Sequence, residues 1–186
     1  MPERISALDG HYRSGRFGSE GDTGVCIQLV NDLILQQVAA WPQTLNQVGE
    51  LAAQFAEAAE APGPGRSTIT EKGAILRIEP LKWWLIGIDA VDIEPDLGST
   101  LDLSHSRTLL RLTGPKAPLL LNRFLPIDLR DSQFREGAVA SSAMHHVGIT
   151  LWRSTAGYEL FIPRGFALST WEVLFESAQQ FGVQVL

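Results

Sequence analysis

Short apolar segments bounded by proline or glycine alternate along this chain with two longer stretches of helical periodicity. In the longer stretches, apolar residues recur at helical spacing, from Leu45 to Ala59 and from Phe166 to Ala178. A third, short helix is expected over 115–125, starting at its proline. The apolar segments have the composition of strands: 25–30, 74–80, 82–88, 106–114, 144–154, 158–164 and 183–186. Strands and helices mixed in this way predict an α+β fold.

The two halves of the chain share an order of elements, in which a strand and a helix precede a pair of strands. This order predicts two ferredoxin-like modules with antiparallel sheets, each a split β-α-β unit. We expect the first module over residues 25–98 and the second over 99–186, together forming one compact unit. Residues 1–24 are rich in glycine, serine and charge, which predicts a flexible N-terminal arm.

Charge and cysteine content exclude several classes of function. The net charge is −6 and no basic stripe is present, so we expect no binding to nucleic acid. Cys26 is the one cysteine in the sequence, so an internal disulfide is excluded. Cys26 also lacks the spaced Cys and His partners of a zinc site. The N-terminus has no apolar core of signal-peptide length, and no run approaches the ~20 apolar residues of a membrane span. We therefore expect a cytoplasmic protein that does not bind membranes.

Asp102, Ser104 and His105 are the residue types of a hydrolase triad. A base must reach the nucleophile's hydroxyl, whereas neighbours in an extended chain point to opposite faces. No G-x-S-x-G turn surrounds the serine either. We expect Asp102 and Ser104 to bond to local backbone instead, which leaves a small hydrolase as the least favoured hypothesis.

His145 and His146 raise the question of a metal site. We expect them on a strand, where adjacent side chains face apart, and no Asp, Glu or Cys nearby completes a ligand set. We therefore assign no metal ligand and no catalytic residue in this chain.

Three residues are candidates for an interface. Of the adjacent tryptophans Trp83 and Trp84, one should enter the core, and the other should face a partner or a helix of the same chain. Arg164 precedes the last helix, where it could bind an anion or pair with a carboxylate or a partner.

The stretch "LDLSHSRTLLRLTGPKAPLLLNRFLPIDL", residues 101–129, resembles the folate-binding superfamily of the glycine-cleavage T protein. Within it, the chain is most similar to the gamma subunits of heterotetrameric sarcosine oxidase, over roughly residues 25–186. The similarity includes the stretch from Pro80 to Leu85 and "IPRGFALSTW", residues 162–171. It implies a T-protein folate-domain-like fold, and it implies a strand for 33–41, which the residue pattern leaves open between helix and strand. The superfamily positions matched are Asp102, Ser104, His105, Gly114, Pro115 and Asp128.

The resemblance also implies that this chain has a non-catalytic function. The T protein has a catalytic aspartate after the strand that follows the Asp128 loop, whereas no acid lies between Glu136 and Glu159 here. The implied role is a non-catalytic gamma subunit that stabilises the alpha subunit of a complex oxidising sarcosine to glycine. Its partners would be the alpha, beta and delta subunits, which would hold FAD, FMN, NAD, tetrahydrofolate and zinc.

The alternative is a stand-alone folate- or pteridine-binding protein related to the aminomethyltransferases. Such a protein needs a carboxylate for the pterin, and Asp128 and Glu159 are the candidates. If the chain is a subunit, its isolated form should expose an apolar patch and could self-associate to cover it.

Overall fold

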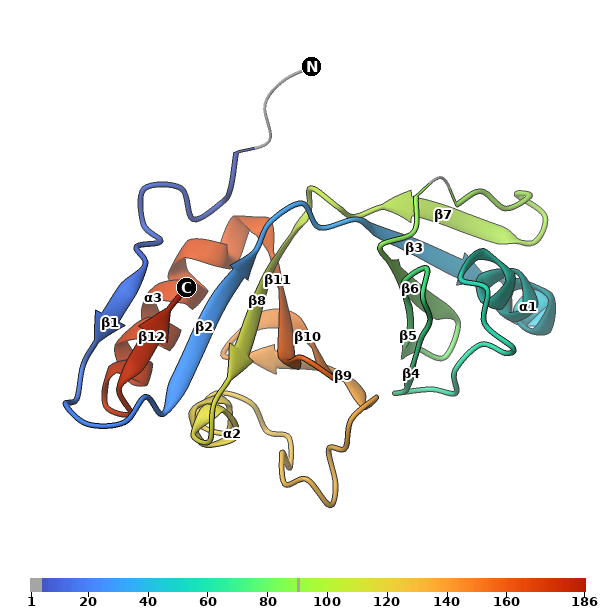
Figure 1. Ribbon diagram of the computed structural model, residues 1–186. Coiled ribbons are helices and arrows are strands. Elements are labelled where there is room, and N and C mark those ends of the chain that lie inside the picture. Colours follow the sequence, from blue (N-terminus) through green and yellow to red (C-terminus); the bar gives the residue numbers. More distant parts are fainter. Residues whose placement is uncertain (1–4, 90) are drawn as a thin grey trace. The chain divides into compact units, whose positions relative to one another are not determined.

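The computed structural model describes residues 5–89 and 91–186 (Figure 1). Contacts divide the chain into two compact units that interleave along the sequence, whereas we expected successive modules over 25–98 and 99–186. Unit 1 contains the residues up to Asn31 together with Ser106–Glu136 and Ser142–Leu186. Unit 2 contains Asp32–His105 and Gly137–Ser141.

Unit 1 is built on a seven-stranded sheet in the order β1-β12-β2-β8-β11-β10-β9. The β12–β2 pair is parallel, and β8 pairs antiparallel with both β2 and β11. Within β9, the residues up to Ser141 belong to unit 2 and the residues from Ser142 on belong to unit 1. The strands are β1 (Gly15–Phe17), β2 (Val25–Val30), β8 (Arg107–Thr113), β9 (Val139–Met144), β10 (Val147–Ser154), β11 (Gly157–Pro163) and β12 (Val183–Val185).

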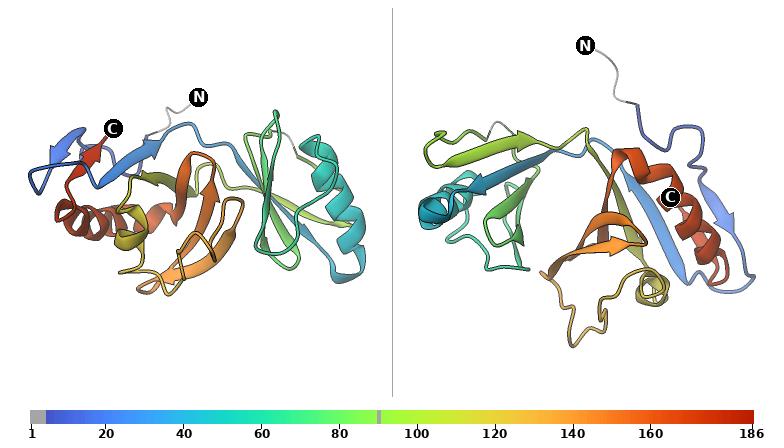
Figure 2. Two further views of the ribbon diagram at one scale, coloured as in Figure 1. Left: turned by 60° about the horizontal axis from the view of Figure 1, so that its bottom comes forward. Right: turned by 180° about the vertical axis from the view of Figure 1, so that it is seen from behind.

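Helix α3 (Ala167–Gln179) follows a short 3-10 turn, η2 (Arg164–Phe166), and connects β11 to β12. Because β8 and β2 lie between those two strands, the connection is a split β-α-β unit, as the sequence predicted for this half. Figure 2 shows α3 lying along one face of the sheet. The short helix α2 (Ala117–Leu121) follows β8.

Unit 2 has a five-stranded sheet in the order β4-β5-β6-β3-β7. All four pairings in it are antiparallel, and α1 (Leu45–Phe55) leads from β3 to the far edge strand β4. The prediction of a second split β-α-β module is therefore wrong for this unit, because tight turns join β4, β5 and β6 as consecutive hairpins. The strands are β3 (Leu35–Ala40), β4 (Ser67–Ile69), β5 (Ala74–Glu79), β6 (Lys82–Ile86) and β7 (Gly98–Asp102).

Helix α1 starts after a proline-led 3-10 turn, η1 (Pro42–Thr44), and buries the face that carries Val48, Ala52 and Ala53. These residues join a core cluster with the sheet residues Val38, Ile75, Trp83 and Leu85. The helical spacing of the apolar residues in the sequence therefore marks the face of α1 that packs on the sheet.

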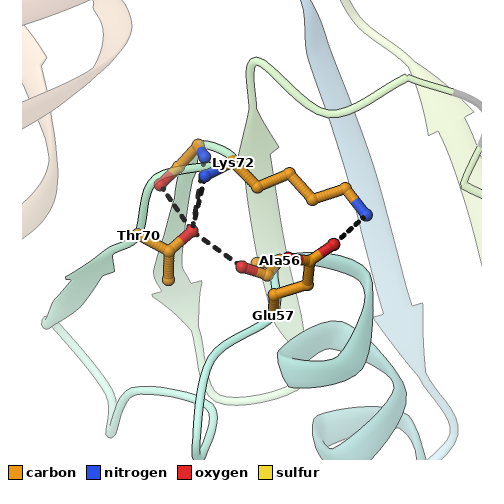
Figure 3. A network of polar contacts seen from close by, with 5 residues as sticks. Ala56, Glu57, Thr70 and Lys72 are labelled. Atoms are coloured by element: carbon orange, nitrogen blue, oxygen red, sulfur yellow. Dashed lines mark hydrogen bonds and ion pairs between the residues drawn. The ribbon is translucent and has the colours of Figure 1, made fainter.

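The end of α1 is fastened to the β4–β5 turn (Figure 3). Glu57 has φ 55°, its N–H donates to the Gln54 carbonyl, and the Ala58 N–H donates to the Ala53 carbonyl. This is the bonding of a Schellman motif, whose left-handed position glycine usually takes. The Thr70 hydroxyl donates to the Ala56 carbonyl at 2.7 Å. Its side chain therefore satisfies a carbonyl that the helix itself leaves free.

We expected a flexible arm over residues 1–24. Residues 1–4 lie outside the described part of the chain, and residues 5–24 pack against the rest of unit 1. Strand β1 pairs with β12, and the rings of Phe17 and Phe175 meet edge to face with centroids 5.1 Å apart. The Tyr12 hydroxyl accepts the Leu29 N–H at 2.8 Å and lies 3.0 Å from the carbonyl oxygens of Ile27 and Leu186. These contacts come from residues far apart in the sequence, so the composition of the segment could not reveal them.

Candidate functional site

The Asp102–Ser104–His105 stretch forms the end of β7 and a turn rather than continuing an extended strand. Ser104 is 8% exposed, its hydroxyl accepts the Leu35 N–H at 2.9 Å, and its own N–H donates to Asp102 Oδ1 at 2.8 Å. His105 is exposed. The Ser104 hydroxyl is thus bonded to the backbone of β3, which is the structural role expected from the sequence and not that of a nucleophile.

Asp102 shows the electrostatic consequence of this turn. Hydrogen bonding from the Ser104 side chain, followed by the bond from its backbone N–H, holds the pKa of Asp102 below its usual value of 3.8. The carboxylate therefore stays ionised and acts as a hydrogen-bond acceptor in the turn.

Trp83 and Trp84 are both buried, at 1% and 3% exposure. Of the two alternatives, burial of both rings fits the one in which the same chain covers them. Trp83 lies in the core beside α1, and the Trp84 indole N–H donates to Gln37 Oε1 at 3.2 Å. Alternation along a strand separates the two rings but does not expose either, because both faces of β6 are covered.

Arg164 is exposed in η2, and its Nη2 donates to the Ile5 carbonyl at 2.6 Å. Its backbone N–H donates to the Ser106 carbonyl. The guanidinium therefore contacts the backbone of the N-terminal segment, and the sequence indicated neither of these partners.

Glu159 is a buried carboxylate in the middle of the unit 1 sheet, 1% exposed. Its Oε1 accepts Arg111 Nε at 2.6 Å and the Ser154 hydroxyl at 2.9 Å. Among the described residues, its Oε2 has no hydrogen-bond partner. Arg111 lies directly opposite Glu159 on β8, so the strand register creates this pair.

Asp128, the other folate-pocket candidate, is exposed and paired with Arg130, whose Nε lies 2.8 Å from Asp128 Oδ1. Hydrogen bonds from the Arg130 side chain and backbone lower the pKa of Asp128. The neighbouring Leu129 carbonyl accepts the Tyr158 hydroxyl, and Tyr158 points to the opposite face of the sheet from Glu159. The structure thus does not bring the two candidate carboxylates together.

His145 and His146 lie in the tight turn between β9 and β10, so our expectation that they lie on a strand is wrong. His145 has φ 54°, and its ring meets Phe124, whereas the His146 ring meets Phe166. Across residues 5–89 and 91–186, no three His, Cys, Asp or Glu side chains converge as metal ligands would.

Two functional candidates escaped the sequence analysis, Arg77 on β5 and Arg111 on β8. Each is a cation with an apolar residue on either side in its strand, Leu76 and Ile78 around Arg77 and Leu110 and Leu112 around Arg111. A long charged residue inside such a run is the signal that could have revealed them, since it needs a partner or a ligand in the fold.

No family model matches the chain. It is 28% identical to the sarcosine oxidase subunit gamma of Corynebacterium sp. (strain P-1), over 68% of this chain and 70% of that protein. It is 33% identical to the sarcosine oxidase subunit gamma of an Arthrobacter species, over 37% of this chain and 34% of that protein. In the part of the chain that the structure describes, no helix has the length and apolarity needed to cross a membrane.

Two solved structures show the same fold. A chain of the heterotetrameric sarcosine oxidase from Corynebacterium sp. U-96, in complex with pyrrole 2-carboxylate, matches with a TM-score of 0.76 and 20% identity. That match covers 89% of this chain and 88% of the other. The glycine cleavage system aminomethyltransferase T from Bartonella henselae matches with a TM-score of 0.59 and 17% identity, over 88% of this chain and 48% of the other.

Proposed function

Since this chain is a homologue of the sarcosine oxidase gamma subunits and is structurally related to glycine-cleavage T protein, we propose that it is a non-catalytic gamma subunit. In this proposal it stabilises the alpha subunit of a heterotetramer that oxidatively demethylates sarcosine to glycine. The observation that carries the proposal is the structural likeness over nearly the full length of both chains, at a TM-score of 0.76.

The hydrogen bonds that the polar side chains already make support a non-catalytic role. The Ser104 hydroxyl is bonded to the backbone of Leu35, and the Glu159 carboxylate is bonded to Arg111. The proposed partners are cytoplasmic alpha, beta and delta subunits, and the proposal places FAD, FMN, NAD, tetrahydrofolate and zinc in them rather than in this chain.

Exposed apolar side chains support a role in assembly. Phe166 and Val173 are 45% and 38% exposed, and they lie on η2 and α3 of unit 1. Apolar side chains of this size on a surface suit contact with another chain. Self-association of the isolated chain remains a prediction, which sedimentation can test.

The test is to purify the tagged chain from its own source and to assay the eluate for sarcosine-dependent hydrogen peroxide release. We expect the activity to elute with the chain, together with alpha, beta and delta chains identified by mass. We also expect the isolated chain to be inactive and its removal to lower the melting temperature of the remaining complex. Elution of the chain alone, from cells that contain the oxidase, would contradict the proposal.

A stand-alone folate- or pteridine-binding protein is the second candidate, and the unpartnered Oε2 of buried Glu159 favours it. A pterin ring offers N–H donors to such an oxygen. Fluorescence titration of the isolated chain with tetrahydrofolate tests this candidate, with Asp128→Ala and Glu159→Ala as variants. Binding that survives in both variants, or no binding by the wild type, would remove it.

A further inference from the structure

Residues 5–19, which we call the strap, cover one side of α3 and the β12 edge of the unit 1 sheet (Figure 1). The Tyr12 ring of the strap meets the ring of Trp171 on α3, with centroids 4.9 Å apart. One turn further along α3, the Phe17 ring meets Phe175 edge to face. Two aromatic side chains of the strap therefore cover two aromatic side chains of the helix.

The surface beneath the strap has two features that favour contact with another chain. Trp171 is buried and stacks on Phe175 with ring centroids 5.2 Å apart, so removal of the strap would expose an aromatic cluster. Strand β12 would also become an edge with unpaired N–H and C=O groups, because β1 is its pairing partner on that side. We therefore expect a strap to cover this surface in the folded protein, whether it comes from the same chain or from another.

A short, largely exposed segment, residues 20–23, connects the strap to the rest of unit 1. Ser19 is the last residue of the strap that bonds to α3, and Gly24 is the first residue after the segment that bonds to the chain between α3 and β12. In the part of the chain that the structure describes, the one hydrogen bond to residues 20–23 runs from the Arg16 guanidinium to the Gly21 carbonyl. Because Arg16 belongs to the strap, the segment can straighten without breaking a hydrogen bond to the rest of unit 1.

The register of β12 fixes the distance that the chain must cross between the strap and β2. Phe17 of β1 and Val25 of β2 lie opposite the same β12 residue, Val183, on its two sides. Neighbouring strands are about 4.8 Å apart, so the crossing is about 10 Å. The connection from Phe17 to Val25 would reach up to about 26 Å when extended. It is therefore long enough to place the strap either on its own chain or on a second copy within that reach.

We propose that the isolated chain dimerises by exchange of straps, so that the strap of each copy covers α3 and β12 of the other. The strap of a second copy fits this surface because it can make the same hydrogen bonds and aromatic contacts as the strap of the same chain. Exchange of an identical element between two copies is a low-cost route to a dimer. The strap and the surface both belong to unit 1, and the inference does not depend on the proposed subunit role.

The experiment joins the strap of one full-length chain to β12 of another by a disulfide. Arg16 and Gln184 lie opposite each other in the β1–β12 pair, a spacing that a disulfide can bridge. One chain carries Arg16→Cys and a second, tagged chain carries Gln184→Cys, each together with Cys26→Ser. The two chains are mixed under reducing conditions at about 1 mM, which populates even a weak dimer, and are then oxidised. We expect a covalent heterodimer.

Two controls separate strap exchange from chance collisions. A single chain with both Arg16→Cys and Gln184→Cys, oxidised at low concentration, shows the yield of the bond within one chain. A tagged chain with Gln133→Cys, an exposed loop residue, replaces the Gln184→Cys chain and measures disulfides formed by collision. A heterodimer yield with Gln184→Cys that is no higher than with Gln133→Cys would overturn the proposal.

Sedimentation gives a second measurement that needs no cysteine. Deletion of residues 20–23 leaves a connection of at most about 14 Å between Phe17 and Val25, which must still pass around residues 179–182. A shortened hinge disfavours closure on the same chain and favours exchange. We expect the wild type to dimerise with rising concentration, and the deletion variant to dimerise at roughly tenfold lower concentration or less. A wild type that stays monomeric up to about 1 mM, or a deletion variant that is no more dimeric than the wild type, would overturn the proposal.

Discussion

At the scale of single residues, the hydroxyl of Ser104 shows how a catalytic-looking side chain can serve the fold. It accepts the N–H of Leu35, the first residue of β3, and both residues are buried. A buried N–H that loses its acceptor costs about 1–3 kcal/mol. The turn that carries Ser104 is thereby joined to the neighbouring strand.

We therefore expect Ser104→Ala to lower the free energy of unfolding by about 1–3 kcal/mol, as measured by urea denaturation. Ser141→Ala serves as the control. The Ser141 hydroxyl is exposed and donates to the Ile78 carbonyl at 3.2 Å, so its loss should change stability by less than ~0.5 kcal/mol. Unchanged stability of Ser104→Ala together with the loss of an ester-hydrolysing activity would instead support the hydrolase hypothesis.

At the residue scale, only part of the candidate site could be predicted from the sequence. Backbone bonding by Asp102 and Ser104 follows from their residue types, and the structure confirms it. The burial of Trp84 and the environment of Glu159 could not be predicted, because burial of both faces of a strand and the pairing of Glu159 with Arg111 depend on which strands become neighbours. The tertiary fold, and not the local sequence pattern, determines which strands are neighbours in the sheet.

At the scale of elements, the C-terminus of α1 offers a test of backbone strain. Glu57 holds a left-handed conformation that costs a non-glycine residue about 1 kcal/mol or more, and its ion pair with Lys72 is largely exposed. We expect Glu57→Gly to raise the free energy of unfolding by about 0.5–1 kcal/mol. The comparison is Glu57→Ala, which loses the ion pair, keeps the strain and should be no more stable than wild type. Equal stability of the two variants would contradict this account.

Elements with strong apolar patterns were predicted correctly, whereas four strands were missed. The residue pattern predicted α1, α2 and α3 and every interior strand of both sheets except β3, for which the family resemblance implied a strand. The missed strands are β1, β4, β7 and β9, and these are the four edges of the two sheets. Interior strands are covered on both faces and read as apolar runs, whereas edge strands are short and carry polar or small residues. The error therefore has one physical cause.

At the scale of the whole molecule, Tyr12 links segments from both ends of the chain. Its hydroxyl contacts β2 and the Leu186 carbonyl, and burial raises its pKa above the usual value of 10.0. Because the folded state then holds the phenol proton more tightly than the unfolded chain does, this contribution to stability is full below pH 10. It is lost as the pH rises through the folded-state pKa.

We expect Tyr12→Phe to lower the free energy of unfolding by about 1–2 kcal/mol at neutral pH, since the Leu29 N–H loses its acceptor. The difference between wild type and variant should narrow as the pH rises above 10.0. Urea denaturation at stepped pH measures both, and a difference that widens with pH would contradict the raised pKa. The Tyr158 hydroxyl is present in both proteins, so its own titration cancels.

The interleaved units give the chain a nested architecture, which local patterns could not predict. Residues 32–105, which belong to unit 2, lie in the sequence between β2 and β8. Those two strands are antiparallel neighbours in the sheet of unit 1. Topologically, the segment is an insertion in a β-hairpin. A gene in which the dipeptide Asn-Gly replaces this segment would leave a four-residue loop, Asn-Gly-Ser106-Arg107, between Asn31 and Thr108. A loop of that length retains the β2–β8 register, with Val30 opposite Leu109. Residues 32–105, which are all of unit 2 except Gly137–Ser141, could thus be removed or exchanged as one segment, whereas unit 1 cannot be obtained by cutting the chain at a single point.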